Sequence, residues 1–286
     1  MTFRQKIILN KYLGYFKLLL LYGILLLGVA AMAFPFLWMA STSFKGRTGL
    51  FVFPPQLIPN WPWRFENYRE IFTLLPFHMG FINSAKIAII NTLGVIISCT
   101  MAAFGFSKLN FRFKKQLFMI LLATMMIPQQ VTLIPMFVWF RNFGWIDTHL
   151  PLIVPVVLCN AFGVFLMRQF FMTIPDSYVE SAKIDGASYP MIYLRIMLPL
   201  CIPPMATLGV FTFMWNWNNF LTPLIFIHSR VNFTIPLFLQ SFQSGYAVNW
   251  NLLMAAATMS ILPIIFIYIF AQRYFIAGVV LSGIKG

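Results

Sequence analysis

Asp176–Pro199 reads DSYVESAKIDGASYPMIYLRIMLP, a charged and small-residue segment between two long apolar runs. It holds Asp176, Glu180 and Asp185, three of the six acidic residues of the chain. Pro175 before Asp176 is typical of a helix start, and Ser177-x-x-Glu180 has the spacing of a capping box. We therefore expect a short capped helix to begin at Asp176 or Ser177.

The second half of this segment predicts a turn and another helix. Gly186 can end the first helix, because glycine takes a left-handed conformation without steric cost. Pro190 suits a first helical position, and the following pattern runs to Met197 and stops at Pro199. The segment is thus a helix–turn–helix outside the membrane, joined at both ends to helices inside it.

Composition indicates that most of the remaining chain lies in a membrane. The 286 residues are 60% hydrophobic and 9% charged, whereas a soluble domain carries about 25% charged residues. The excess apolar surface has to face lipid. The net charge of +14 does not indicate nucleic acid as a partner, because the chain has no basic domain. Cys99, Cys159 and Cys201 lack the spacing of metal ligands or of a disulfide framework.

Long apolar runs predict an all-α, polytopic membrane protein with six transmembrane helices. The expected spans are 18–40, 82–107, 116–140, 150–170, 201–227 and 251–272. The six-helix domain (18–272), with an outer loop over 41–81, lies between an N-terminal arm (1–17) and a C-terminal tail (273–286). Pro128 and Pro135 predict a kink in the third span. Gly278, Gly283 and Gly286 predict a flexible tail.

The distribution of basic residues predicts which loops are cytoplasmic. Six spans place both termini on one side. Of the 20 Lys and Arg residues, 13 lie in the arm, the tail and the loops of that side, and six lie on the other side. The positive-inside rule therefore places both termini and the segment 176–199 in the cytoplasm.

The chain lacks the residue patterns of an ATPase, an enzyme or an ion-coupled carrier. There is no Gly-x-x-x-x-Gly-Lys-Ser/Thr segment to hold nucleotide phosphates. No catalytic set or metal-ligand set is recognisable. None of the six acidic residues falls at mid-membrane depth, where a carrier usually binds its coupling ion. Energy is therefore expected from another subunit, received through the cytoplasmic segment.

The segment 176–199 resembles the EAA loop of bacterial binding-protein-dependent ABC-importer permeases, and the chain is closest to the carbohydrate (maltose-type) permeases. Ser181 stands where the family pattern usually has alanine, a small residue for a small one. The matching residues are Glu180, Ala182, Asp185, Gly186 and Ala187, followed after eight positions by Ile196, Leu198 and Pro199.

This resemblance implies the partners and a coupling role. The partners are a second, non-identical permease, a pair of ATPase subunits that bind ATP and Mg, an extracytoplasmic solute-binding protein, and membrane lipid of the bacterial inner membrane. The loop is expected to dock on the ATPase through its first helix and to push on the fifth span through its second. Small Ala182 and Ala187 would admit the ATPase surface. The coupling residues are then Ser177, Glu180, Ala182, Asp185, Gly186, Ala187, Ile196 and Pro199.

A path for a polar solute needs polar groups inside the helix bundle. Amides beside aromatic rings suit a sugar, because rings stack on it and amides bind its hydroxyl groups. The alternative is that these amides only hydrogen-bond neighbouring helices. Glycerol 3-phosphate or a polyol is the alternative cargo, and a membrane channel or enzyme is the alternative class. The path candidates are Asn83, Asn91, Gln129, Asn216, Asn218 and Asn219, with Gln130, Asn160, Trp215 and Trp217 beside them.

Overall fold

The computed structural model describes residues 3–46, 52–158, 160–243 and 248–283, and the side chains of 14–46, 52–158, 160–243 and 248–272. All regular structure within these ranges is helical. The chain divides into two units. The first unit combines 1–73 with 242–259, and the second combines 74–241 with 260–286.

The first unit contains α1 (Phe3–Ser43), α2 (Glu66–Leu74) and the beginning of α14 (Trp250–Gly283). Asn67 is buried at the centre of their junction. Its Nδ2 donates to the carbonyl oxygens of Ser43 (2.7 Å) and Lys45 (3.0 Å), and its Oδ1 accepts from Asn251 Nδ2 (3.1 Å). One amide thus joins the end of α1, α2 and the start of α14.

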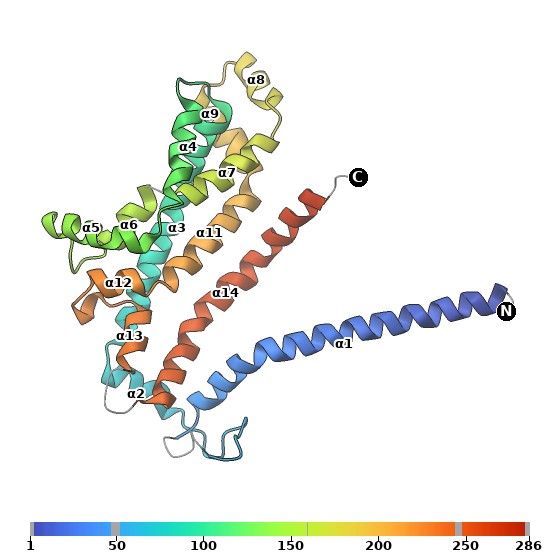
Figure 1. Cartoon of the computed structure of the whole chain (residues 1–286), viewed down its shortest axis with the longest axis vertical. Coiled ribbons are helices and arrows are strands. Elements are labelled where there is room, and N and C mark those ends of the chain that lie inside the picture. The colour runs from blue at the N-terminus through green and yellow to red at the C-terminus, as the bar shows by residue number, and fades with distance from the viewer. Residues whose placement is uncertain (1–2, 47–51, 159, 244–247, 284–286) are drawn as a thin grey trace. The chain divides into compact units, whose positions relative to one another are not determined.

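In the second unit, α3 (Phe77–Lys108) is the central helix. It packs against α6 (Leu150–Leu158), α7 (Ala161–Thr173) and α11 (Ile202–Trp217) (Figure 1). Gly163 of α7 lies directly against Cys99 of α3, and a Cβ at this glycine would be 2.6 Å from the cysteine Sγ. Small residues at such crossings allow two transmembrane helices to approach closely.

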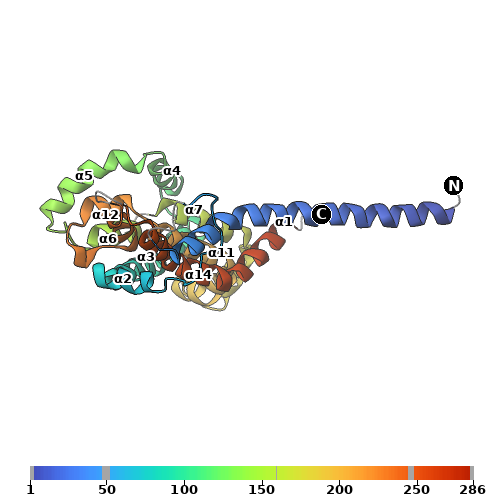
Figure 2. The same ribbon diagram turned by 90° about the horizontal axis from the view of Figure 1, so that it is seen from below.

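The predicted third span is broken rather than kinked. Its residues form α4 (Lys114–Thr124) and α5 (Gln129–Asn142), which meet at 95° (Figure 2). Pro128 lies immediately before α5, in an extended conformation that a helix interior does not allow. Pro135 stands within α5 without ending it. Of the two prolines, Pro128 therefore marks the break.

The predicted fifth span, 201–227, is wrong at its C-terminal end. The residues before this span form α9 (Tyr189–Ile192), a π-helical turn (Tyr193–Met197) and α10 (Leu198–Leu200). Together they make an angle of 79° with α11, which begins the span. The span then ends at Trp217. Asn219 Oδ1 accepts the Thr222 backbone N–H (3.3 Å) at the start of the separate helix α12 (Leu221–Phe226). The turn Arg230–Asn232 and α13 (Ile235–Ser241) follow.

Of the other predicted spans, 18–40, 82–107 and 251–272 each fall within one helix, whereas 150–170 covers α6 and most of α7. Among the described residues, four helical segments are long and apolar enough to cross a membrane, or up to six if each bent pair is one span. They include Gly14–Ser43, Phe77–Lys108, Leu150–Thr173 and Trp250–Gln272. The prediction of a flexible tail is wrong as far as Gly283, because α14 continues to that residue. Gly286 lies outside the described residues.

Candidate functional site: the loop 176–199

The first helix of the loop is α8 (Ser177–Ile184), with Asp176 at its N-cap. The predicted capping box is wrong, because no side chain caps this end. The Asp176 carboxylate instead accepts a hydrogen bond from Lys108 Nζ at 2.6 Å. Glu180 is exposed, and the Ser177 carbonyl accepts from the Ser181 hydroxyl (2.8 Å). The entrance of α8 is therefore held by an ion pair with α3.

Gly186 ends α8 as the sequence predicts. Its φ of 81° is left-handed. The Gly186 N–H donates to the Lys183 carbonyl (3.0 Å), and the Ala187 N–H donates to the Ala182 carbonyl (2.9 Å). These two bonds form a Schellman motif, which satisfies carbonyl groups that the helix end would leave free. The turn between the two helices of the loop is thus fixed by backbone hydrogen bonds.

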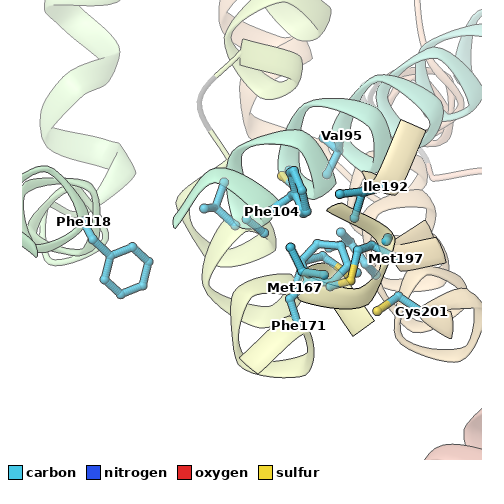
Figure 3. Close-up of a cluster of buried hydrophobic side chains, with 14 residues drawn as sticks. Val95, Phe104, Phe118, Met167, Phe171, Ile192, Met197 and Cys201 are labelled. Carbon is cyan, nitrogen blue, oxygen red and sulfur yellow. The ribbon is translucent and has the colours of Figure 1, made fainter. Parts of the chain in front are cut away.

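One face of α8 is buried in the protein itself. Val179 and Ala182 are 5% and 7% exposed and join a cluster of apolar side chains from α3, α7 and the second half of the loop. Ala187 is half-buried against the same cluster. The expectation that Ala182 admits a partner surface is therefore wrong, because its methyl group faces inward. In Figure 3, Val95, Phe104, Met167, Phe171, Ile192, Met197 and Cys201 gather in this cluster.

The opposite face of α8 is exposed and includes a residue that the sequence reading missed. Ile184 is 87% exposed, next to the exposed carboxylates of Glu180 and Asp185. It lies five positions after Val179, so it falls outside the i, i+3, i+4 spacing of the buried face. An apolar residue outside the buried face of a helix is the sequence signal by which Ile184 could have been found. The face combines one apolar side chain with two acidic groups.

The second half of the loop continues through Pro199 instead of stopping there. Tyr193 lies in the π-helical turn, and its hydroxyl is 2.8 Å from Thr100 Oγ1 of α3. Ile196 is half-buried and Pro199 is exposed. The direction changes at Cys201, where α10 meets α11. This half therefore leads from the loop into α11 while also contacting α3.

Three of the path candidates are buried and bonded to this chain. Asn83 Nδ2 donates to the carbonyls of Val231 (2.8 Å) and Phe233 (3.0 Å). Asn91 Nδ2 donates to the Leu152 carbonyl (2.9 Å) and to Asn216 Oδ1 (2.5 Å). These bonds match the alternative interpretation, in which the amides hold helices together. A role in a path stays a prediction for Asn83, Asn91 and Asn216.

The remaining candidates lie around the breaks between helices. Gln129 Nε2 (3.3 Å) and Asn219 Nδ2 (3.2 Å) both donate to Thr222 Oγ1. Gln129 and Asn218 are exposed, and Trp215 is 70% exposed. Asn160, which the sequence placed beside the candidates, is the N-cap of α7 and accepts the Gly163 N–H (2.7 Å). The structure thus brings Gln129 and Asn219 together at one hydroxyl.

No metal-ligand set is present in the part of the chain that the structure describes, since no three His, Cys, Asp or Glu side chains gather there. Asn218 Nδ2 donates to the Met214 carbonyl (2.9 Å), so Gln129, Asn218 and Asn219 all donate a hydrogen bond within the chain. The exposed face of α8 carries apolar and acidic groups.

Comparison with known proteins gives one consistent family. Residues 94–280 match the family described as binding-protein-dependent transport system inner membrane component. The arabinooligosaccharides transport system permease protein AraQ of Halalkalibacterium halodurans is 30% identical over 260 residues, covering 88% of this chain and 91% of that protein. The lactose transport system permease protein LacG of Rhizobium radiobacter is 29% identical over 261 residues, covering 90% and 93%.

A solved structure confirms the fold. The crystal structure of a bacterial ABC transporter involved in the import of the acidic polysaccharide alginate contains a chain that superposes with a TM-score of 0.80. The match covers 91% of this chain and 97% of that chain at 22% sequence identity. The predicted all-α permease fold is therefore correct.

Proposed function

Because the chain belongs to the family of binding-protein-dependent transport system inner membrane components, we propose that it forms half of the translocation path of an ATP-driven importer for a sugar or oligosaccharide. The chain is a multi-pass membrane protein and a transport subunit rather than an enzyme. The sugar class is supported by the names of its relatives, which include arabinooligosaccharide and lactose permeases.

The proposed partners are a second, non-identical permease, a pair of ATPase subunits and an extracytoplasmic solute-binding protein. The ATPase subunits bind ATP and Mg, and both termini of this chain face the cytoplasm with them. The excess of Lys and Arg on that side supports this orientation. A reporter enzyme that is active only in the cytoplasm, fused after Gly286, tests it. Activity of a periplasm-specific reporter at the same position would contradict it.

The exposed face of α8 is the proposed ATPase contact. Its exposure is the observation that supports a coupling role for the loop. Val179 and Ala182 fix the helix to the protein, while Ile184, Glu180 and Asp185 remain exposed. An apolar side chain can fill a pocket on the ATPase, and the carboxylates can pair with basic side chains around it. Since Gly186 holds a rigid turn, movement of α8 is passed to α9 and then to α11.

For the solute, the proposed contacts are Gln129, Asn218 and Asn219, together with the exposed ring of Trp215. Amides and an aromatic ring match the hydroxyl groups and the apolar faces of a sugar ring. Gln129 and Asn219 lie where helices are broken, and irregular backbone at membrane depth is tolerated where it lines a cavity.

Transport by the complete complex in proteoliposomes tests the function. The four kinds of subunit are reconstituted with ATP inside the vesicles, and uptake of labelled oligosaccharides, glycerol 3-phosphate and a polyol is compared. ATP-dependent uptake of a sugar is the expected result. Uptake of glycerol 3-phosphate alone would retain the importer and overturn the sugar assignment. Uptake without the ATPase subunits would overturn the importer assignment itself.

A further inference from the structure

Lys108, the last residue of α3, is a buried cation at the entrance of the loop. Its side chain is 3% exposed. The Nζ atom donates to the Ile174 carbonyl (2.6 Å) and to Asp176 Oδ1 (2.6 Å). Both acceptors lie directly before α8. The hydrogen bond from Lys108 and its positive charge lower the pKa of Asp176 below the ordinary value, so the carboxylate is ionised at neutral pH.

The neighbouring basic side chains are directed at other acceptors. Lys114 Nζ donates to the carbonyls of Ser107 (3.2 Å) and Leu109 (2.7 Å), and Arg168 Nε donates to the Phe106 carbonyl (3.1 Å). Cations commonly bind the free carbonyls at a helix C-terminus in this way. Lys114 and Arg168 thus bond carbonyl groups at the C-terminal end of α3, whereas Lys108 bonds residues at the entrance of the coupling loop.

The same helix also contacts the second half of the loop. Thr100 precedes Lys108 by about two helical turns and is hydrogen-bonded to the Tyr193 hydroxyl at 2.8 Å. Between them, the Phe104 ring packs on the Tyr193 ring, with centroids 5.5 Å apart. Tyr193 lies in the π-helical turn, and such turns are frequent at functional sites. The C-terminal part of α3 therefore holds both the entrance and the exit of the loop.

We propose that Lys108 is a positioning residue of the coupling loop, which ties the entrance of α8 to the end of α3 so that movement of α8 reaches α3 directly. This inference rests on the proposed function. It adds a second route to the one through α11, because α3 is the central helix of the second unit. The ion pair suits this role, since removing the Asp176 carboxylate leaves the buried Lys108 charge without the anion that offsets its burial.

The test measures solute imported per ATP hydrolysed in the reconstituted complex, a ratio that a purely stabilising role would leave unchanged. Lys108→Met removes the charge and keeps the apolar part of the side chain. Asp176→Asn removes the other charge at a side chain that is 76% exposed, so its substitution leaves the core intact. Asp176→Glu keeps the carboxylate. Lys115→Met is the matched control, because it removes the same charge from an exposed position in the first turn of α4, outside the coupling loop.

We expect Lys108→Met and Asp176→Asn to lower the ratio several-fold, and the double variant to be no worse than Lys108→Met alone. Asp176→Glu should restore most of the ratio, and Lys115→Met should match the parental complex. A parental ratio in Asp176→Asn overturns the inference, even where Lys108→Met fails to enter the membrane. A parental complex that imports nothing overturns the proposed function instead, so the two failures are distinguishable.

Discussion

Ala182 and Ile184 are two positions apart in α8 and have opposite surroundings. The alanine is buried among apolar side chains of the second unit, whereas the isoleucine is 87% exposed. A substitution at the first position acts on folding of this chain. A substitution at Ile184 is expected to affect the contact between α8 and the proposed ATPase partner. Comparing substitutions at Ala182 and Ile184 therefore distinguishes an effect on the stability of this chain from an effect on its coupling to the ATPase.

Ala182→Trp is therefore expected to destabilise the protein. Overpacking of a close-packed core typically costs about 1–3 kcal/mol, and the indole would have to enter the buried cluster that includes Val179 and Met197. The measurement is the thermal unfolding midpoint in detergent. Ile184→Ser should leave this midpoint unchanged while reducing the amount of ATPase that co-purifies. A stable Ala182→Trp variant that fails only in ATPase binding would show that Ala182 contacts the partner after all.

Gly186 gives a second prediction at the residue scale. A Cβ at this position would meet no atom within 4 Å, but its φ of 81° is strained for other residues. Gly186→Leu should weaken the Schellman turn by about 1–2 kcal/mol and lower ATP-dependent import. Gly186→Asn is the control, because asparagine tolerates the left-handed conformation. Equal import by both variants and the parental protein would show that the turn is dispensable.

At the scale of elements, the sequence predicted the long helices and the loop better than the breaks. Apolar length and the Gly186 turn depend on local chemistry, and both predictions were correct. Pro128 indicates a bend before α5, but the 95° angle between α4 and α5 and the end of α11 at Trp217 do not follow from local residue types alone. Tertiary contacts also act there, such as the bond from Gln129 to the Thr222 hydroxyl. The pairing of Asp176 with Lys108 joins residues 68 positions apart, which capping rules for one helix do not consider.

The segment before α6 is joined to the segment after α12 by one carboxylate. Asp147 accepts from the Ser229 hydroxyl and from the backbone N–H groups of Ser229 (2.8 Å) and His228 (2.9 Å). These bonds, with that of the Ser229 hydroxyl the largest, lower the pKa of Asp147 from 3.8 to about 2. His149 strengthens the junction by bonding the Asn232 carbonyl (2.9 Å), and burial lowers the pKa of this imidazole.

The lowered pKa of Asp147 predicts a pH-dependent contribution to stability. Because the ordinary pKa of this carboxyl is 3.8, the contribution is complete well above that pH and is lost as the pH falls through about 2. Asp147→Asn should remove this component and lower stability at neutral pH, while asparagine tolerates the φ of 61°. The measurement is the thermal unfolding midpoint of both proteins as a function of pH, from pH 7 to pH 2. The same pH profile in both proteins would contradict the assignment.

At the scale of the whole molecule, each of the two units leaves much apolar surface that its own described residues do not cover. None of the apolar window in Gly14–Ser43 is buried. On the second unit, a groove of about 960 Å³ is lined almost entirely by apolar side chains of α3, α11 and α14, including Phe81, Trp217 and Phe266. Lipid can cover apolar side chains of this kind. Gln129 Nε2 donates to Thr222 Oγ1 and Asn218 Nδ2 donates to the Met214 carbonyl, but lipid cannot bond the other polar atoms of these exposed amides.

The chain is therefore expected to be unstable without a second permease. A polar group facing hydrocarbon is costly, and a partner bundle can supply its hydrogen bonds. Expressed alone, the chain should give a low yield and a broad size-exclusion profile in detergent. Co-expression with the second permease should give a monodisperse complex with a higher unfolding midpoint. Replacing Gln129 and Asn218 by leucine should improve the behaviour of the isolated chain, because the exposed amide atoms that lipid cannot bond are removed at the loss of one hydrogen bond within the chain at each position. A monodisperse, transport-competent homodimer of the parental chain would contradict the need for a non-identical partner.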